Sequence, residues 1–184
     1  MQAHPTPLAG LMLLEPKVYG DDRGFFFESF NARVFADLTG HAGPFVQDNH
    51  SRSSHGVLRG LHYQITQPQG KLVRVIVGAV YDAVVDLRRH SPTFGQHYAC
   101  HLSAENRRML WIPPGFAHGF LTLSESAEFL YKTTDYWLAS AERSLLWNDP
   151  ALAIPWPLNN VGIAPLLSPK DQQGRPLVEA DVYP

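Results

Sequence analysis

Residues 49–64 contain three histidines and two arginines, although charged residues make up only 17% of the chain. Within this stretch, Gly56 and Gly60 interrupt a run that otherwise alternates between apolar and polar residues, as in a half-buried strand. A glycine in a strand allows a ligand to approach the backbone closely. We therefore expect His62 to project from a sheet face into a ligand site.

The two arginines of this stretch, Arg52 and Arg59, indicate the kind of ligand. An isolated histidine is more often a hydrogen-bonded core residue, but guanidinium groups hold phosphate or carboxylate in a fixed pose. Strict alternation from His62 places Arg59 on the opposite face of the strand. Either a bulge at Gly60 or a path round the sheet edge would bring both side chains to one site, and the sequence leaves both alternatives open.

The composition is that of one ordinary globular domain, with 184 residues, 45% hydrophobic residues and a formal net charge of -2. The chain has 15 Lys and Arg residues and 17 Asp and Glu residues, so there is no excess of positive charge for binding nucleic acid or an anionic membrane surface. The single cysteine, Cys100, has no intrachain disulfide partner, and no stretch combines a basic start with a long apolar run. These features predict a cytoplasmic protein without a membrane segment.

Short runs of β-branched and aromatic residues, separated by Gly, Pro, Asn and Asp, predict an all-β sandwich or barrel. Gly78-Ala79 joins two such runs, as in a tight hairpin. The expected strands are residues 11–14, 25–30, 72–77, 80–87, 109–112, 120–123 and 129–134, with the strand around His62.

Helix is expected to be sparse. Residues 31–38 predict a short helix with Asn31 as its N-cap, and residues 103–108 predict a further turn. We expect a single domain over residues 1–184, with its core at about 11–147 and an irregular, proline-rich tail at 148–184 that wraps the barrel.

The spacing Pro-x-Gly-x-x-His at residues 113–118 is similar to the second half of the metal motif of cupins. The first half, His-x-His with a later Glu, is replaced by His62-Tyr63-Gln64 and no suitably placed glutamate. Two histidines alone make a poor site for a divalent cation. The protein is therefore expected to work without a metal or other cofactor.

An ordered set of motifs along nearly the whole chain closely resembles the dTDP-4-dehydrorhamnose 3,5-epimerases. The motifs are DNHSRS from Asp48, GVLRGLHYQ from Gly56, QGKLVR from Gln69, SPTFG from Ser91, WIPPGFAHGF from Trp111, YKTTDY from Tyr131, WNDP from Trp147 and LSPKD from Leu167. The resemblance implies a metal-free cupin-type jelly roll with a few short helices. It also implies a homodimer whose active site is shared between subunits.

The activity implied by the resemblance is conversion of dTDP-4-dehydro-6-deoxy-D-glucose to dTDP-4-dehydro-L-rhamnose, in the biosynthesis of dTDP-L-rhamnose for polysaccharides such as O antigen. A ketone at C4 acidifies the C–H bonds at C3 and C5, so one base and one opposed acid can invert both centres. The first alternative is a mono-epimerase that inverts only C3 or only C5. A non-catalytic ligand-binding cupin ranks next, and a metal-dependent cupin enzyme last.

The catalytic roles implied by the family pattern fall on four residues. His62 is the base, because an imidazole titrates near working pH, and Asp171 fixes its tautomer. Tyr131 is the acid, and Lys71 stabilises the enolate oxygen at C4. Without the resemblance, Tyr131 would equally well be a core aromatic residue.

The binding roles implied by the family pattern fall on further residues. Trp137 stands where the family commonly has a tyrosine that stacks on thymine, and the neighbouring Tyr136 is the alternative stacking ring. As isolated charges, Glu142 and Arg23 would be read as solvated surface groups. The implied binding set is Arg59 for the diphosphate, Arg23 and Glu28 from the neighbouring subunit, Gln47, Asp48 and Asn49 for the nucleotide or sugar, His118 for the sugar or phosphate, and Lys71, Glu142 and Lys170 within the pocket.

Overall fold

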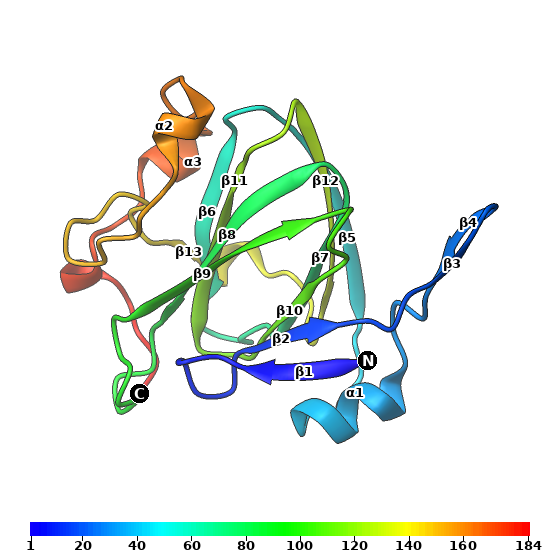
Figure 1. The fold of residues 1–184 in the computed structure, drawn as a ribbon. Helices are drawn as coiled ribbons and strands as arrows, with labels where there is room; N and C mark the ends of the chain where they lie inside the picture. The colour runs from blue at the N-terminus through cyan, green and yellow to red at the C-terminus, as the bar shows by residue number, and fades with distance from the viewer.

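The structure is a computed structural model that describes residues 1–184. Two antiparallel sheets face each other and form a flattened barrel (Figure 1). The six-stranded sheet contains, in spatial order, β1 (Gln2–Pro5), β2 (Met12–Glu15), β10 (Met109–Ile112), β7 (Lys71–Val77), β12 (Ser126–Thr133) and β5 (Gln47–Ser54). The five-stranded sheet contains β13 (Glu142–Ser144), β6 (Leu58–Gln64), β11 (Phe116–Thr122), β8 (Ala79–Asp86) and β9 (His97–Ser103). The expected all-β jelly roll is confirmed.

Side-chain alternation along each strand divides the apolar residues between two layers. On β8, Val80 and Val84 face the other sheet and belong to the main core, whereas Ala83 and Val85 face outward. The outer face of the five-stranded sheet is therefore also apolar, and every residue of β11 is buried. This second apolar face must be covered, and the C-terminal tail covers it.

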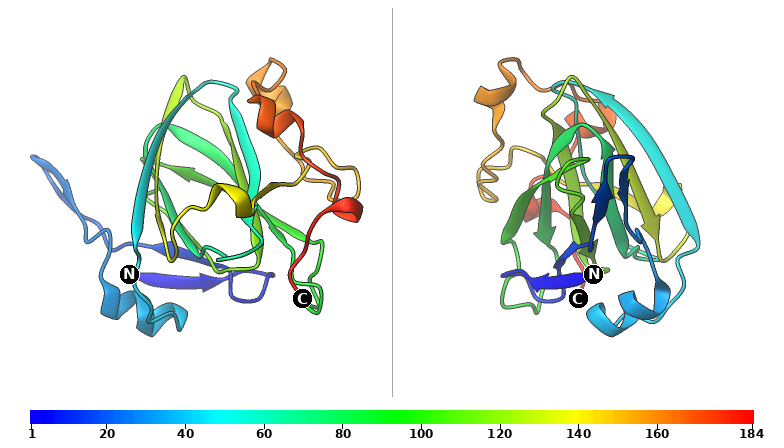
Figure 2. Two further views of the ribbon diagram at one scale, coloured as in Figure 1. Left: turned by 180° about the vertical axis from the view of Figure 1, so that it is seen from behind. Right: turned by 45° about the vertical axis from the view of Figure 1, so that its right-hand side comes forward.

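The tail packs as irregular chain with short helical turns against the five-stranded sheet (Figures 1 and 2). Trp156 and Tyr183 of the tail pack on a buried cluster that includes Leu61 and Leu145. The helical elements of the chain after β12 are η1 (Ala139–Ala141), α2 (Leu158–Val161), α3 (Pro169–Gln172) and η2 (Leu177–Glu179). The sequence did not indicate α2 or α3, because a four-residue helix carries almost no periodic signal.

The first helix, α1 (Ala32–Thr39), matches the expected position. The side chain of Asn31 accepts hydrogen bonds from the backbone N–H groups of Arg33 and Val34, as an N-cap does. Phe35 is the buried residue of the helix and packs edge-on against Trp111 at the outer face of the six-stranded sheet. The turn expected at 103–108 is also present.

The expected hairpin at Gly78 is wrong. The glycine does form a tight turn, with φ +73°, but β7 and β8 lie in different sheets and do not pair. A Cβ at Gly78 would lie 2.1 Å from the carbonyl oxygen of Ser126, so the turn is pressed against the start of β12. The chain therefore crosses from one sheet to the other at this point, which local sequence cannot distinguish from a hairpin.

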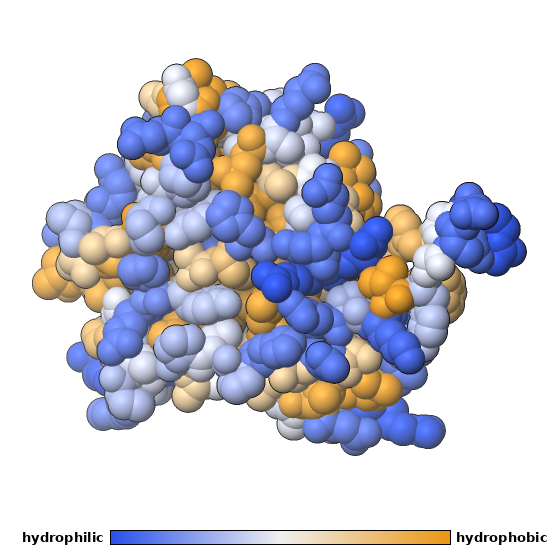
Figure 3. All heavy atoms as spheres, viewed as in Figure 1, coloured by the Kyte–Doolittle hydropathy of each residue, from blue (hydrophilic) through white to orange (hydrophobic).

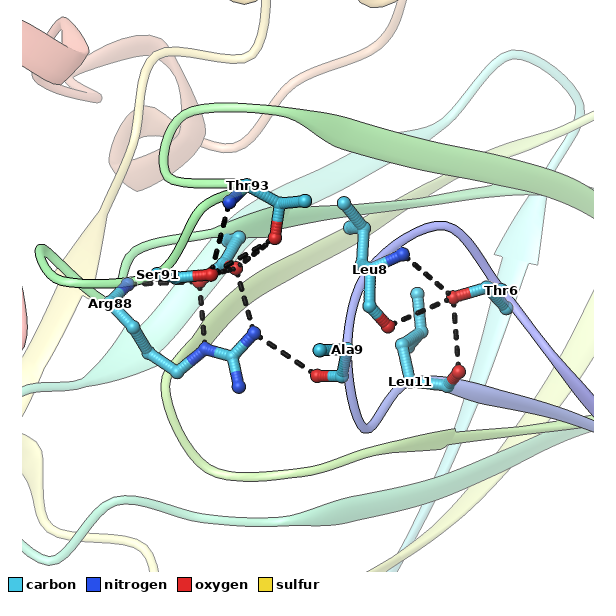
Figure 4. Close-up of polar contacts among 8 residues, drawn as sticks. Thr6, Leu8, Ala9, Leu11, Arg88, Ser91 and Thr93 are labelled. Carbon is cyan, nitrogen blue, oxygen red and sulfur yellow. Dashed lines mark hydrogen bonds and ion pairs between the residues drawn. The ribbon is translucent and has the colours of Figure 1, made fainter.

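A buried carboxylate organises the loop after β8 (Figure 4). Asp86 accepts hydrogen bonds from Arg88 Nε at 2.9 Å, Ser91 Oγ at 2.6 Å and Thr93 Oγ1 at 2.7 Å. Burial opposes ionisation, but these hydrogen bonds outweigh it and lower the pKa of Asp86 to about 2. Arg88 also donates to the carbonyl of Ala9, which ties this loop to the N-terminal segment.

A two-stranded ribbon, formed by β3 (Tyr19–Asp21) and β4 (Gly24–Phe26), projects away from the barrel (Figure 1 and the left view of Figure 2). We call residues 19–26 the arm. Its aromatic residues Tyr19, Phe25 and Phe26 are 55%, 60% and 70% exposed. The arm has a hydrophilic tip, with apolar surface nearer the barrel (Figure 3). No helix of the chain has the length and apolar character needed to cross a membrane.

Candidate active site

A cavity of about 330 Å³ opens between the two sheets. It brings together strands from both sheets, the loop after β12 and the helix α3 of the tail. Most of the residues singled out in the sequence line it. The complete lining is Asn49, His50, Ser51, Arg59, His62, Lys71, His118, Gly119, Phe120, Phe129, Tyr131, Trp137, Glu142 and Lys170.

The His62 imidazole is hydrogen-bonded to a carboxylate 109 residues away in the chain. His62 Nε2 lies 2.6 Å from Asp171 Oδ1, and the Asp171 side chain is 3% exposed. Because an ionised carboxylate only accepts, Nε2 carries the proton and Nδ1 is the nitrogen with a free lone pair. Burial lowers the pKa of His62, against the opposing effect of Asp171, so the ring is neutral and able to accept a proton at neutral pH.

Asp171 is held by the turn that presents it. Ser168 is the N-cap of α3, and its hydroxyl donates to Asp171 Oδ2 at 2.6 Å, while the backbone N–H of Gly60 donates to Oδ1 at 3.0 Å. Burial alone would raise the pKa of Asp171, but the hydrogen bonds from His62, Ser168 and Gly60 reverse this and hold it far below the usual range. The carboxylate is therefore ionised and fixed in position.

Tyr131 approaches the cavity from the opposite side. It lies on β12 of the six-stranded sheet, whereas His62 lies on β6 of the five-stranded sheet. Burial raises the pKa of the Tyr131 phenol, with a further contribution from Glu142, so the hydroxyl keeps its proton at neutral pH. An acceptor for protons and a donor of protons thus face one cavity from opposing sheets.

Lys71, at the start of β7, adds a positive group to the same cavity. Its ammonium donates to the carbonyl oxygen of His62 at 3.4 Å. Burial lowers the pKa of Lys71 to about 8, so the amine remains largely protonated at neutral pH. A cation in this position can stabilise an oxyanion.

A bulge in β6 brings Arg59 to the cavity. His62 is opposite His118 and Arg59 is opposite Phe120, so β6 has one residue more than β11 between these pairs. Gly60, with φ +117°, takes up this extra residue. Of the two alternatives left open by the sequence, the bulge is the one observed. Arg59 Nε donates to Ser53 Oγ at 2.9 Å.

The loop after β12 places Trp137 rather than Tyr136 at the cavity. Gln47 contributes to this arrangement, because its side-chain oxygen accepts from the backbone N–H of Trp137 at 3.0 Å. Gln47 also donates to the side-chain oxygen of Asn49 at 2.9 Å. Gln47 therefore supports two lining residues without lining the cavity itself.

Glu142 and Lys170 form an ion pair at the cavity wall, with Lys170 Nζ 2.7 Å from Glu142 Oε1. Burial alone would raise the pKa of Glu142, but Lys170 outweighs this and lowers it. The pair joins β13 to α3, the helix that carries Asp171. Both side chains lie at the cavity, although each would be taken for a surface charge in isolation.

Four charged residues from the sequence analysis lie outside the cavity of their own chain. Asp48 points to the outer face of the six-stranded sheet, where it pairs with Lys132 at 3.0 Å. Arg23 pairs with Asp21 on the arm, and Glu28 accepts from Asn31 at 3.2 Å. Arg52 does not line the cavity, and only its carbonyl takes part, as acceptor for Arg59.

Sequence reasoning missed β5 and several lining residues. The strand reads QDNHSRSS and has no apolar alternation, so it gives no strand signal. It nevertheless contributes His50 and Ser51 to the cavity. Phe120 and Phe129 were expected as strand residues only, and their rings stack 4.4 Å apart at the cavity floor.

Another residue missed is Asp82, which is 0% exposed and hydrogen-bonded to His118. The available signal is its position between Val80 and Val84, because strand alternation places the three side chains on one face. No group of three or more His, Cys, Asp or Glu side chains is arranged to hold a metal ion. That the protein functions without a metal ion stays a prediction.

The chain matches the family model described as dTDP-4-dehydrorhamnose 3,5-epimerase over residues 5–179. It is 61% identical over 184 residues to the dTDP-4-dehydrorhamnose 3,5-epimerase of Pseudomonas aeruginosa, with 100% of both chains covered. This chain belongs to the dTDP-4-dehydrorhamnose 3,5-epimerase family. The expected family is therefore confirmed, and with it the class of enzyme, an isomerase.

Solved structures agree with this membership. The epimerase of Legionella pneumophila, in complex with dTDP-4-keto-L-rhamnose, has a TM-score of 0.94 and 52% identity and covers 98% of this chain and 94% of its own. A 3′-monoepimerase from Streptomyces bikiniensis, in complex with dTDP-quinovose, has a TM-score of 0.89 and 35% identity, with 95% and 87% covered. The fold thus serves both double and single epimerisation.

Proposed function

We propose that this epimerase converts dTDP-4-dehydro-6-deoxy-D-glucose to dTDP-4-dehydro-L-rhamnose, with His62 as base and Tyr131 as acid. The observation that carries this assignment is their opposition. The His62–Asp171 pair and the Tyr131 hydroxyl face one cavity from opposing sheets. Inversion of a carbon centre needs this arrangement, because the proton must leave from one face of the sugar and return to the other.

In the proposed reaction, Nδ1 of His62 takes the proton from C3 or C5, and the electron pair of the broken C–H bond moves to the oxygen at C4. Lys71 stabilises the resulting enolate as negative charge develops there. Tyr131 then donates its hydroxyl proton to the carbon from the opposite face, and the C4 ketone forms again. His62 then gives its extra proton to solvent and the Tyr131 phenolate takes one up, so both groups regain their starting protonation states. The same cycle at the second carbon completes the double inversion.

The remaining lining residues are assigned to substrate binding. Arg59 binds the diphosphate, because its guanidinium group is the kind of donor that holds phosphate oxygens. Trp137 stacks on the thymine, which is supported by its place at the cavity, whereas Tyr136 lies outside. His118 and Asn49 contact the sugar or its phosphates, and the pair of Glu142 and Lys170 completes the pocket.

The active molecule is proposed to be a homodimer in the cytoplasm. Exposed aromatic residues on the arm and the position of Arg23 and Glu28 outside their own cavity support a contribution of these residues to the cavity of the partner. Gln47 is assigned to the nucleotide side of the same shared site, because it is hydrogen-bonded to Trp137 and Asn49. The product would enter the synthesis of dTDP-L-rhamnose, a precursor of polysaccharides such as O antigen.

The test is incubation with dTDP-4-keto-6-deoxyglucose in deuterated water, followed by location of deuterium in the product by NMR. Deuterium at both C3 and C5 with both centres inverted is the expected result. His62→Ala should abolish both exchange and inversion. A label at C3 alone would instead identify a mono-epimerase of the kind represented by the Streptomyces bikiniensis neighbour. Absence of any exchange by the wild-type protein would refute the assignment.

A further inference from the structure

A second pair of histidine and carboxylate lies beneath the cavity. Asp82 is on β8 between Val80 and Val84, all three being 0% exposed, and its side chain shares their inward face. Asp82 Oδ2 is 2.9 Å from Nε2 of His118, a residue that lines the cavity. The other carboxylate oxygen, Oδ1, has no hydrogen-bond partner in the protein.

This placement is costly for the fold. A carboxylate in an apolar interior loses its hydration, and a buried polar atom without a partner costs about 1–3 kcal/mol. An apolar side chain at this position would continue the row formed by Val80 and Val84. Packing therefore gives no reason for an aspartate here, and a reason connected with His118 is required.

The hydrogen bond determines which nitrogen of His118 faces the substrate. Burial raises the pKa of Asp82, against the opposing effects of His118 and Lys71. In its ionised form the carboxylate only accepts, so Nε2 of His118 carries the proton and Nδ1 is left with a lone pair. Nδ1 has no partner in the protein, so it is free to meet a group in the cavity. The His118 ring also stacks on the ring of Phe129, with the two centroids 5.9 Å apart and an interplanar angle of 29°.

We propose that Asp82 is a positioning residue that fixes His118 with Nδ1 as a hydrogen-bond acceptor for a hydroxyl group of the bound sugar. This role rests on the proposed function, because it concerns the hexose of a nucleotide-linked sugar. It also accounts for the unpaired oxygen of Asp82: a single hydrogen bond is enough to select the tautomer, and the apolar surroundings leave no second donor to compete with His118.

The decisive variant is Asp82→Asn. Its amide can donate to Nε2 of His118, which favours the tautomer with the proton on Nδ1 and replaces the acceptor at the cavity by a donor. The ¹⁵N chemical shifts of His118, assigned by comparison with His118→Gln, should report this exchange of tautomer. Affinity for dTDP-glucose and kcat/KM should both fall by roughly ten- to a hundredfold, as expected for one misplaced hydrogen bond. Affinity for dTDP, which lacks the hexose, should not change.

Two further variants separate positioning from packing. Asp82→Val should lose dTDP-glucose affinity to a similar extent while its Tm equals or exceeds that of wild type, because an apolar residue suits this core. Asp86→Asn is the matched control: it removes another carboxylate of β8 that is 0% exposed, but one hydrogen-bonded to Arg88, Ser91 and Thr93. It should lower Tm and leave the shifts of His118 unchanged.

Several outcomes would overturn the proposal. A lower Tm for Asp82→Asn with unchanged His118 shifts and dTDP-glucose affinity would make Asp82 a structural residue. Equal weakening of dTDP and dTDP-glucose would place the contact on the phosphates rather than on the sugar. If the wild-type protein fails to turn over the keto sugar, the proposed function fails, while the ¹⁵N shifts and the two binding measurements still decide the role of Asp82.

Discussion

The protonation states needed for the reaction follow from the surroundings of three side chains. Burial lowers the pKa of His62 and raises the pKa of Tyr131. At Asp171, burial alone would raise the pKa, but hydrogen bonds outweigh it and lower the pKa. At neutral pH the imidazole is neutral, the phenol is protonated and the carboxylate is ionised. The proposed base and the proposed acid therefore both have the protonation state that the proposed reaction needs.

Removal of the proposed acid should separate proton exchange from inversion. In Tyr131→Phe the base can still take a proton and return it to the same face, so solvent deuterium should enter with the original configuration retained. Because general acid catalysis contributes about 10²–10⁴-fold, the yield of inverted product should fall by that factor. Tm should stay close to wild type. Normal yields of inverted sugar would mean that Tyr131 is only a core aromatic.

Replacement of Asp171, the carboxylate proposed to orient His62, should impair the proposed base without removing it. Asp171→Asn presents an amide to His62 Nε2, and this favours the wrong tautomer, as an asparagine does in a serine protease triad. Deuterium wash-in at C3 and C5 should become much slower, while circular dichroism shows an unchanged fold. Normal wash-in rates in this variant would show that another group orients His62.

At the scale of elements, the bulge in β6 brings Arg59 and His62 to one cavity. A Cβ at Gly60 would lie 2.6 Å from the Cα of Gly119, and the φ of +117° is unfavourable for any other residue. The close packing of β6 and β11 at this point thus requires glycine. Arg59 and His62 share the cavity only because this bulge forms.

Gly60→Ala should therefore lower both stability and activity. The backbone must shift, and a strained conformation costs about 1–3 kcal/mol, measurable by urea unfolding. The value of kcat/KM should fall as Arg59 and His62 are displaced. Gly40→Ala is a suitable control, since Gly40 also has a positive φ, +74°, but has no atom within 4 Å of an added Cβ. Equal losses in the two variants would show that strain alone, and not the bulge, matters.

The C-terminal tail is attached at His55, in the turn between β5 and β6. Its Nδ1 lies 3.1 Å from the carbonyl oxygen of Ser124 and its Nε2 lies 3.0 Å from that of Val161. Both partners only accept, so both contacts are hydrogen bonds only when both nitrogens are protonated. These two contacts raise the pKa of His55, and the contact with Val161 has the larger effect.

The stability given by His55 should therefore depend on pH. A raised pKa in the folded state means that the contribution is complete below the unfolded pKa of about 6.5 and is lost as pH rises through the folded value. The difference in Tm between wild type and His55→Gln should be largest near pH 6 and shrink towards pH 9. A difference that stays constant over this range would exclude an ionised His55.

At the scale of the whole molecule, the arm has no core of its own. A two-stranded ribbon is at best marginally stable in water, and its aromatic residues are largely exposed. Exposed apolar surface of this kind marks a site of association. Docking on a second copy would bury these rings and bring Arg23 and Glu28 towards the cavity of the partner.

The double variant Phe25→Ser and Phe26→Ser should thus be monomeric by light scattering and should lose activity together with the dimer. Val178→Ser provides the control, because Val178 is 90% exposed on the C-terminal tail and should affect neither assembly nor turnover. A double variant that stays dimeric and active would remove the arm from the interface.

The sequence by itself determined the fold class, the short helix after Asn31 and the family, because each is recorded in neighbouring residues. Period-two alternation marks a half-buried strand, an asparagine before an apolar turn marks a helix start, and an ordered set of motifs marks a family. Most of the expected strands are present, but the one at 25–30 ends at Phe26, and β1, β5 and β9 were not expected. The polar strand β5 could not be predicted from the sequence, because it contains no alternation of apolar and polar residues.

Only the tertiary structure decided which side chains meet. The His62–Asp171 contact spans 109 residues and that of His118 with Asp82 spans 36, and no local pattern records such distances. Strand alternation describes the two faces of one strand, but not the sheet to which the strand belongs. It therefore predicts neither the crossing between sheets at Gly78 nor the bulge that brings Arg59 to the cavity. Pairing between distant strands fixes both, because register and bulges are set by the hydrogen bonds of the partner strand.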